Sequence, residues 1–151
     1  MQAVELTRRA VLYVGHKCNL RCRMCYYRMT PHKQWKALAE CKSEVDLFRR
    51  GYGDLSVDIT GGEPTVFPGI VELVGYCAGQ GLRPSMITNG YALASRDRAR
   101  ELRDAGLSDF LLSVHALGDV YNWLTQTSDG ARRQATAVHN LNSLDIPWRA
   151  N

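Results

Sequence analysis

Short runs of β-forming residues alternate with amphipathic helical stretches along almost the whole chain. Each β-rich run is followed by a segment with apolar residues at helical spacing, and glycines mark several of the helix ends. A repeat of strand, helix and strand builds a parallel sheet with right-handed crossovers. We therefore predict an α/β fold, closed or partly closed into a barrel, in one domain that covers residues 1–151.

The expected strands cover residues 10–14, 55–59, 83–88 and 110–114, and a fifth begins at Ile146. The expected helices cover residues 35–50, a stretch from Ile70 to the glycines at 79 and 81, a stretch capped by Ser95 that runs through Leu102, and a stripe formed by Ala135, Val138 and Leu141. A long polar loop is expected between the fourth strand and the last helix. Because the chain stops within the fifth strand, we expect a C-terminal portion or a partner chain to complete the barrel.

Three cysteines, Cys18, Cys22 and Cys25, lie within eight residues soon after the first expected strand. Thiolates ligate the irons of iron–sulfur clusters, which usually have four cysteine ligands, so a group of three leaves one iron free to bind a substrate. A zinc site completed by His16 or His32 is the alternative, because zinc accepts both sulfur and nitrogen ligands. Disulfides are not expected, since the N-terminus does not resemble a signal peptide.

A glycine-rich element, Gly61-Gly62-Glu63-Pro64, follows the second expected strand. Active sites of parallel α/β folds form at the carboxyl ends of the strands, where this element lies. The glycines allow a sharp bend and a close approach to the carbonyl groups, and the Glu63 carboxylate is an acceptor for an ammonium group. An ordinary turn in which Pro64 opens the next helix is the alternative. A phosphate-binding loop is excluded, because the Gly-Lys-Ser/Thr ending is missing.

With a Cys-x3-Cys-x2-Cys loop after strand one and Gly-Gly-Glu-Pro after strand two, the chain resembles the radical S-adenosylmethionine (radical SAM) superfamily. The resemblance implies a partial (βα)6 TIM-like barrel, truncated here within strand five, in which Cys18, Cys22 and Cys25 hold a [4Fe–4S] cluster. In that family the free iron chelates S-adenosylmethionine, and reduction yields methionine and a 5′-deoxyadenosyl radical that abstracts hydrogen from a substrate. The resemblance thus implies an oxidoreductase or transferase with a flavodoxin or ferredoxin as electron donor.

The resemblance also implies cofactor-binding residues at the strand ends. Gly61, Gly62 and Glu63 resemble the element that receives the methionine amino group. Met24 stands where family members often carry an aromatic residue near the adenine, and Tyr26 can share that task. The ribose or carboxylate of the cofactor is assigned to polar strand-end residues, for which simple turn hydrogen bonding is the alternative: Asn89, Ser113 and Asn151. Roles in substrate binding or in plain packing stay open for His115, Tyr27, His32, Tyr121 and Trp123.

Charge and composition say more about the surroundings of the cysteines and about membrane contact than about the substrate. The first 50 residues hold eleven Lys or Arg against four acids, and five of these basic residues surround the cysteines: Arg21, Arg23, Arg28, Lys33 and Lys36. They attract an anionic substrate or a nucleic acid, or they form a solvated basic face. The remaining cysteines, Cys41 and Cys77, lie in helical patterns and are expected to pack as small apolar groups. No apolar run approaches the roughly 20 residues that span a bilayer, so we expect a cytoplasmic protein without membrane contact.

The sequence leaves the substrate open among peptides, nucleosides, RNA and small metabolites. Two further interpretations stand beside the generic enzyme. One is a compact activating protein that installs a glycyl radical on a partner enzyme, which the short chain suits. The other is a scaffold that binds zinc or iron without catalysis.

Overall fold

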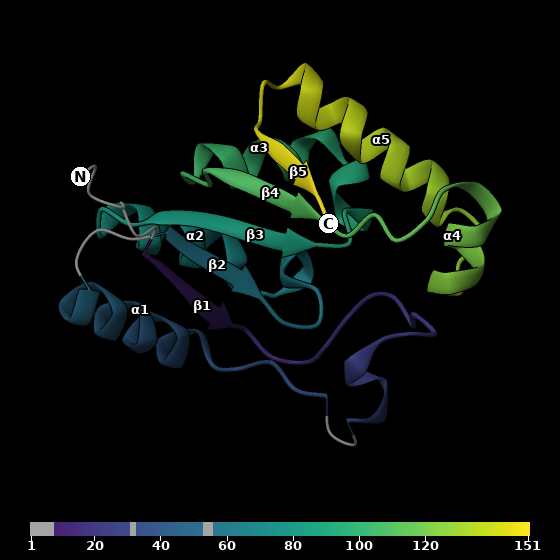
Figure 1. Cartoon of the computed structure of the whole chain (residues 1–151). Coiled ribbons are helices and arrows are strands. Elements are labelled where there is room, and N and C mark those ends of the chain that lie inside the picture. Colours follow the sequence, from purple (N-terminus) through teal and green to yellow (C-terminus); the bar gives the residue numbers. More distant parts are fainter. Residues whose placement is uncertain (1–7, 31–32, 53–55) are drawn as a thin grey trace, which may run out of the picture.

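The computed structural model describes residues 8–30, 33–52 and 56–151. Within these residues the strands form one parallel sheet in the order β1-β2-β3-β4-β5. The strands are β1 (Arg9–Tyr13), β2 (Ser56–Thr60), β3 (Arg83–Thr88), β4 (Asp109–Leu112) and β5 (Trp148–Ala150). The helices are α1 (Leu38–Tyr52), α2 (Ile70–Gly79), α3 (Arg96–Asp104), α4 (Gly118–Thr125) and α5 (Gly130–Ser143), as Figure 1 shows.

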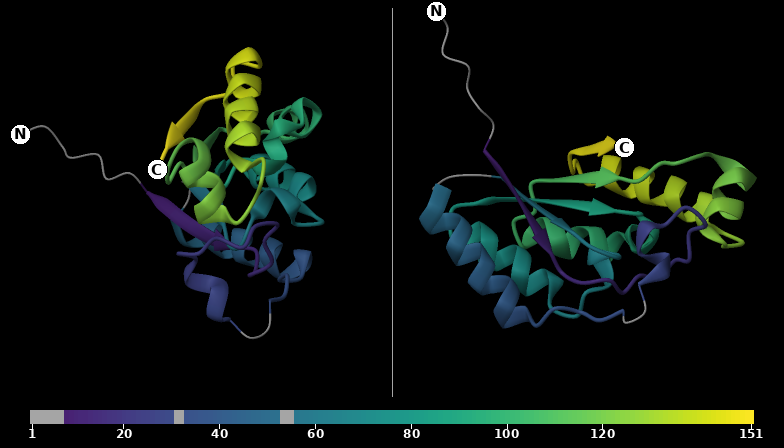
Figure 2. Two further views of the ribbon diagram at one scale, coloured as in Figure 1. Left: turned by 90° about the vertical axis from the view of Figure 1, so that its right-hand side faces the viewer. Right: turned by 60° about the horizontal axis from the view of Figure 1, so that its bottom comes forward.

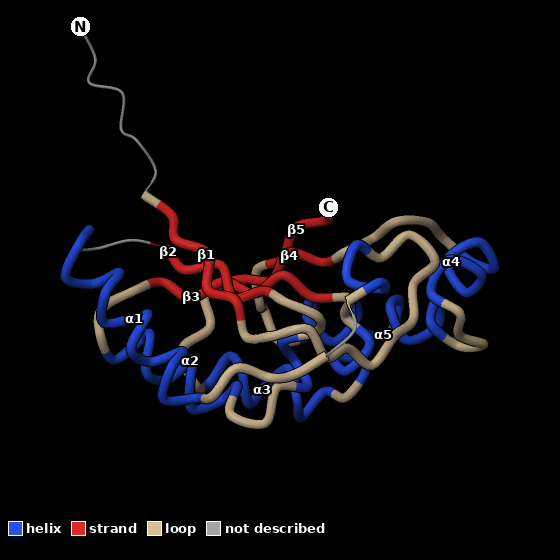
Figure 3. Tube along the Cα trace, turned by 90° about the horizontal axis from the view of Figure 1, so that it is seen from below, coloured by secondary structure: helices blue, strands red, loops and turns tan. Residues whose placement is uncertain are grey.

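The strand order follows the chain order, which confirms the predicted α/β fold of the partial-barrel type. Strands alternate with helices, and Figure 3 shows α1, α2 and α3 together on one side of the strands. All strands run the same way, so their carboxyl ends meet at one edge of the sheet (Figure 1). That edge is where an α/β protein builds its site.

The core lies between the sheet and these helices. Alternate strand residues point to it, because successive side chains of a strand face opposite sides of the sheet. Leu12, Ile59, Met86 and Phe110 are fully buried on this side, whereas Val11 next to Leu12 is 59% exposed. Burying large apolar side chains stabilises a fold by roughly 1.5–3 kcal/mol each. The two remaining cysteines, predicted to pack as apolar groups, lie in this core: Cys41 and Cys77.

Three predicted features differ in the structure. The helix expected from Trp35 begins at Leu38, because Trp35 forms an antiparallel bridge with Gly15 instead. The strand expected to reach residue 114 ends at Leu112, where the Val114 amide turns back to donate to the Leu112 carbonyl at 3.0 Å. The polar loop expected after it contains helix α4.

Two further predictions concern the end of α1 and the start of β2. Helix α1, expected to end at residue 50, continues through Gly51 to Tyr52. Gly53, which follows it, and the expected first strand residue, Leu55, lie outside the described residues. Among the residues that are described, no helix has the length and apolar character needed to cross a membrane.

Candidate functional site

The cysteine loop (residues 16–30) leaves the sheet at the carboxyl end of β1 and is fastened at its base. Gly15 pairs with Trp35, and the His16 amide donates to the Gln34 carbonyl at 2.9 Å. Gly15 has a φ of +120°, and a Cβ there would lie 2.4 Å from the Gln34 carbonyl oxygen. Only glycine adopts this positive φ without strain and leaves room for the Gln34 carbonyl. Gly15 therefore holds the start of the cysteine loop against the segment around Gln34.

Helix α4 holds the loop at a second point. The Arg23 amide donates to the Leu124 carbonyl at 2.7 Å, and its Nε donates to the Trp123 carbonyl at 3.0 Å. The Arg23 guanidinium also stacks 4.7 Å from the centre of the Trp123 ring. Gln126, just after α4, donates its side-chain amide to the Arg21 carbonyl. Figure 2 shows the loop and α4 side by side at this end of the sheet.

The Gly61-Gly62-Glu63 element forms the third attachment. The Gly62 amide donates to the Gly15 carbonyl at 2.8 Å, and the Glu63 amide donates to the Lys17 carbonyl at 2.9 Å. A Cβ on Gly62 would lie 2.1 Å from the Lys17 carbonyl oxygen, and one on Gly61 would lie 2.5 Å from the Gly15 carbonyl oxygen. Gly61 and Gly62 therefore lack a Cβ where the backbone of residues 15–17, at the start of the cysteine loop, packs against them.

Glu63 is buried at the centre of a set of hydrogen bonds, with 1% of its surface exposed. Its Oε1 accepts from the Thr65 amide at 3.0 Å, the Thr65 hydroxyl at 2.5 Å and the Thr88 hydroxyl at 2.6 Å. Its Oε2 accepts from the Asn89 amide at 2.8 Å. Burial raises the pKa of Glu63, and these four donors oppose that rise. The carboxylate thus joins the ends of β2 and β3.

The three cysteines of the loop are half-buried thiols. Cys18 Sγ accepts from the Leu20 amide at 3.4 Å and from the Asn89 side-chain amide at 3.8 Å. Burial raises the pKa of Cys18 to about 11, against the Leu20 hydrogen bond, and burial also raises the pKa of Cys22. A thiol with a raised pKa needs a bound cation to become a thiolate at neutral pH, and metal ions supply that charge.

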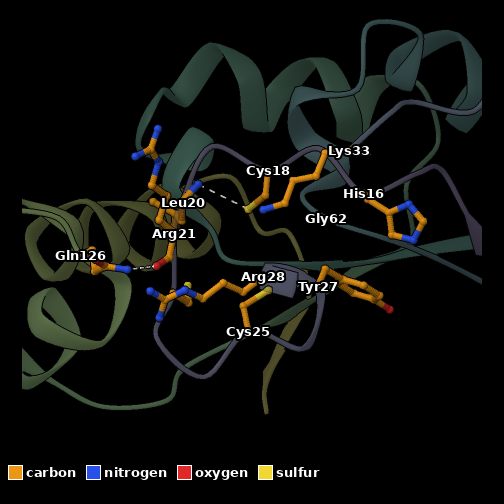
Figure 4. A pocket seen from close by; sticks show the side chains of 11 residues that line it. His16, Cys18, Leu20, Arg21, Cys25, Tyr27, Arg28, Lys33, Gly62 and Gln126 are labelled. Atoms are coloured by element: carbon orange, nitrogen blue, oxygen red, sulfur yellow. Dashed lines mark hydrogen bonds between the residues drawn. The ribbon is translucent and has the colours of Figure 1, made fainter. Parts of the chain in front are cut away.

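Two pockets meet at the cysteine loop. The strand-end pocket, about 280 Å³ in volume, lies over the carboxyl ends of β2, β3 and β4, where Thr60, Ile87 and Ser113 line it. The basic pocket, about 420 Å³ in volume, opens beside Arg21 and Arg28, as Figure 4 shows. All three cysteines line both pockets, together with two other residues that the pockets share: Tyr27 and Gly62.

The structure brings together nearly all the residues predicted for the site. The strand-end pocket is lined by Cys18, Cys22, Cys25, Met24, Gly61, Gly62, Glu63, Asn89 and Ser113, and also by Tyr26, Tyr27 and His115. Asn151 is not among its lining residues; the Asn151 backbone extends the pairing of β4 and β5 by donating to the Leu112 carbonyl at 2.8 Å.

The residues with open roles have distinct surroundings. Tyr121 and Trp123 lie on α4, not on a loop; Tyr121 is buried against the strand-end pocket and Trp123 is largely exposed. His16 packs its ring against Tyr27 at 5.3 Å between centroids and lines the basic pocket. His32 lies outside the described residues. Among the residues that are described, no three His, Cys, Asp or Glu side chains are arranged to hold a single metal ion.

Two threonines that shape the site were missed from the sequence, and the contact made by Tyr121, whose role was left open, was not predicted. Thr65 and Thr88 hold Glu63, and Tyr121 donates its hydroxyl to the Asn89 carbonyl at 3.3 Å. Thr88 directly precedes a predicted site residue at a strand end, which was a usable signal. No sequence pattern marked Thr65 as a partner of Glu63, although it lies only two positions further along, and the Asn89 partner of Tyr121 lies 32 positions away in the sequence.

The fold and the pocket at the carboxyl ends of its strands define a βα-barrel type of enzyme scaffold. The model of the radical SAM superfamily matches residues 12–148, and the chain belongs to that family. Members of the family use a [4Fe–4S] cluster and S-adenosylmethionine as cofactors. The prediction made from the two motifs is thereby confirmed.

Named relatives differ in what they act on. The chain is 39% identical over 108 residues to a PqqA peptide cyclase of Methylorubrum populi, which covers 68% of this chain and 27% of that protein. It is 35% identical over 106 residues to a probable GTP 3′,8-cyclase of Metallosphaera sedula, which covers 68% of this chain and 32% of that protein. The chain spans about a third of the length of such relatives.

Solved structures share the fold. Streptococcus suis SuiB bound to the precursor peptide SuiA matches with a TM-score of 0.79 and 22% identity, over 97% of this chain and 33% of that one. The enzyme anSMEcpe with bound AdoMet and the Cp18Cys peptide matches with a TM-score of 0.74 and 18% identity, over 96% of this chain and 42% of that one. At these identities the likeness concerns the fold.

Proposed function

We propose that Cys18, Cys22 and Cys25 hold a [4Fe–4S] cluster and that the chain performs radical SAM chemistry. The observation that carries the proposal is that all three thiols of one loop border the strand-end pocket of a radical SAM fold. The other two cysteines are sealed in the core, so within the described residues only three thiols border this pocket. When bound and reduced, the cluster supplies one electron that cleaves S-adenosylmethionine to methionine and a 5′-deoxyadenosyl radical.

The donor set fits such a cluster better than it fits one ion. Each cysteine of a cluster binds its own iron, so the thiols need to surround a volume instead of converging on a point. The loop provides that arrangement with thiols facing two adjoining pockets. Basic side chains of Arg21, Arg28 and Lys33 line the same space and offset the negative charge of thiolates and sulfides.

S-adenosylmethionine fits the strand-end pocket through the residues after β2, β3 and β4. Glu63 Oε1 already accepts three hydrogen bonds, but Oε2 accepts one and keeps acceptor capacity for an ammonium group. We assign the amino group to the Gly61-Gly62-Glu63 element, the adenine side to Met24, and polar contacts to Asn89 and Ser113. Asn151 is outside this assignment, because it does not line the pocket.

The proposal includes a separate electron donor and a peptide substrate. The basic residues beside the cysteines suit an acidic redox protein such as a flavodoxin or ferredoxin. Among the described residues that line the strand-end pocket, none is Lys or Arg, which disfavours a triphosphate, and the exposed ring of Tyr26 suits a peptide. The peptide cyclases among the relatives support the same class.

Anaerobic reconstitution tests the cluster and its chemistry. The chain, given iron, sulfide, S-adenosylmethionine and dithionite, should bind a [4Fe–4S] cluster and release 5′-deoxyadenosine. Cys22→Ala should abolish cluster assembly, whereas Cys41→Ala, which removes a core thiol of the same kind, should retain it. Protein that purifies with one zinc and no sulfide, or Cys22→Ala protein with a full cluster, would overturn the assignment.

Isotope transfer tests the substrate class. Peptides digested from fully deuterated cells should pass deuterium into 5′-deoxyadenosine, because abstraction moves the substrate hydrogen to the 5′ carbon. Deuterated GTP should pass none. Transfer from GTP with none from the peptide pool would contradict the peptide assignment and leave the cluster assignment intact.

A further inference from the structure

Cys18 differs from the other two cysteines in the hydrogen bonds that its sulfur receives. Its Sγ accepts from the Leu20 amide at 3.4 Å, the bond that Figure 4 marks, and from the Asn89 side-chain amide at 3.8 Å. Within the described part of the chain, neither Cys22 nor Cys25 receives a hydrogen bond from the side chain of another residue. The donor on Cys18 comes from the far end of β3, 71 positions away in the sequence.

The orientation of the Asn89 amide is fixed by its other contacts. Its Oδ1 accepts from the Tyr91 amide at 2.9 Å, so a flipped side chain would set two donors against each other. Its Nδ2 therefore faces the cysteine loop, where its two hydrogens meet two acceptors, Cys18 Sγ at 3.8 Å and Asn19 Oδ1 at 3.0 Å.

The backbone of Asn89 is held as firmly as its side chain. The Glu63 carboxylate accepts from the Asn89 amide at 2.8 Å, and the Tyr121 hydroxyl donates to the Asn89 carbonyl at 3.3 Å. The next residue, Gly90, has a φ of +75° and donates its amide to the Thr88 hydroxyl at 3.0 Å. Glu63 thus holds the backbone of the residue whose side chain donates to Cys18.

We propose that Asn89 is a positioning residue that sets the reduction potential of the cluster through its hydrogen bond to Cys18. The inference rests on the proposed function, because it requires Cys18 to ligate the cluster. A hydrogen bond to a ligand sulfur withdraws negative charge, and the reduced cluster carries one more negative charge than the oxidised one. The bond therefore stabilises the reduced form and raises the potential.

Two variants separate this role from turn formation. Asn89→Ser keeps a side-chain oxygen that can accept from the Tyr91 amide, as serine does in turns, but it cannot reach Cys18. Asn89→Ala removes both interactions. Asn19→Ala is the matched control, since it removes the neighbouring oxygen that accepts from the same amide and from the Cys18 thiol, and it leaves the Asn89 donor to Cys18 in place.

The measurement is a redox titration of the reconstituted full chain without S-adenosylmethionine, followed by electron paramagnetic resonance of the reduced cluster. Asn89→Ser and Asn89→Ala should both shift the potential to more negative values, and Asn19→Ala should shift it less. Resonance Raman spectra should show a changed iron–sulfur(Cys) stretching band in the Asn89 variants. Iron and sulfide content of each protein is measured in parallel.

The outcomes are decisive in each case. Cluster in the wild type with an unchanged potential in Asn89→Ser overturns the inference alone. Loss of the cluster from both Asn89 variants makes Asn89 a structural residue and also overturns it. A wild-type chain that takes up no cluster overturns the proposed function instead. Equal shifts in Asn89→Ser and Asn19→Ala would assign the effect to the general polarity of the loop and refute the specific bond.

Discussion

Replacing Gly62 with alanine should unfold the junction between the glycine-rich element and the cysteine loop. The added Cβ would lie 2.1 Å from the Lys17 carbonyl oxygen and 2.6 Å from the His16 carbonyl oxygen. Carbon and oxygen atoms in close contact normally stay about 3.3 Å apart. Both obstacles are backbone atoms of a segment that is paired elsewhere, so no side-chain rotation relieves the clash.

The cost follows from the contacts that the displaced backbone must give up. The Gly62 amide loses its bond to the Gly15 carbonyl and the Glu63 amide loses its bond to the Lys17 carbonyl, now 2.8 and 2.9 Å long. Two net hydrogen bonds contribute about 1–3 kcal/mol, and overpacking adds about 1–3 kcal/mol of strain. We expect the free energy of unfolding to fall by roughly 2–6 kcal/mol.

Urea denaturation of the reduced, metal-free chain measures this change. With a slope of roughly 2 kcal/mol per molar urea, the midpoint of the Gly62→Ala variant should fall by about 1–3 M. Gly79→Ala is the control: it lies at the end of α2 with no atom within 4 Å of an added Cβ, and it should raise stability slightly. If the Gly62→Ala midpoint changes as little as the Gly79→Ala midpoint, the backbone of Lys17 does not pack closely against Gly62.

Three further changes test other parts of the structure. Ser95→Ala removes the N-terminal cap of α3, where the Ser95 hydroxyl accepts from the Arg98 amide at 3.4 Å. It should lower the free energy of unfolding in urea by about 1 kcal/mol. The control, Ser43→Ala on the exposed side of α1, should change that free energy by less than about 0.5 kcal/mol. Arg23→Ala removes a ring contact and a hydrogen bond to α4 and should lower the free energy of unfolding by about 1 kcal/mol; an unchanged midpoint would show that α4 does not need this side chain. Burial raises the pKa of Glu63 above its ordinary value of 4.5. Between these two pKa values the folded protein holds a proton on Glu63 that the unfolded chain has released. The contribution of Glu63 to the free energy of unfolding therefore falls as the pH rises through this range. Glu63→Gln should flatten that decline in a series of urea midpoints against pH, and an identical decline in both proteins would contradict the direction of the shift.

The parallel α/β fold was predictable from the sequence, and the strand ends indicated where the candidate site residues gather. The strand expected over residues 83–88 matches β3 within its observed bounds, because a short β-forming run followed by an Asn-Gly turn is a local signal. The cysteine triplet and the glycine-rich element indicated the family for a similar reason, since each motif is contiguous. Parallel strands then bring the residues that follow them to one edge, which is how Asn89 and Ser113 come to line a single pocket.

Contacts across the sequence were not predictable. Helix α1 begins late because Trp35 pairs with Gly15, 20 positions earlier in the numbering, and no periodicity within α1 reports that pairing. Helix α4 was read as a polar loop because only two of its residues are buried, Tyr121 and Thr125, too few for a clear stripe. The hydrogen bonds of Glu63 with Thr88 and Asn89 were not predicted for the same reason, because they join two strand ends 25 and 26 positions apart in the sequence.

These long-range contacts form a closed ring around the proposed cluster site. The cysteine loop bonds to Glu63 through the Lys17 carbonyl, Glu63 bonds to Asn89, and the Asn89 carbonyl accepts from Tyr121 on α4. Helix α4 then returns to the loop through Arg23. Ordering each residue of a loop costs roughly 1–2 kcal/mol of backbone entropy. These contacts order the cysteine loop when the chain folds, so the entropy cost is met before iron and sulfide bind. Breaking any one of the contacts should therefore weaken cluster binding, even where no thiol is changed.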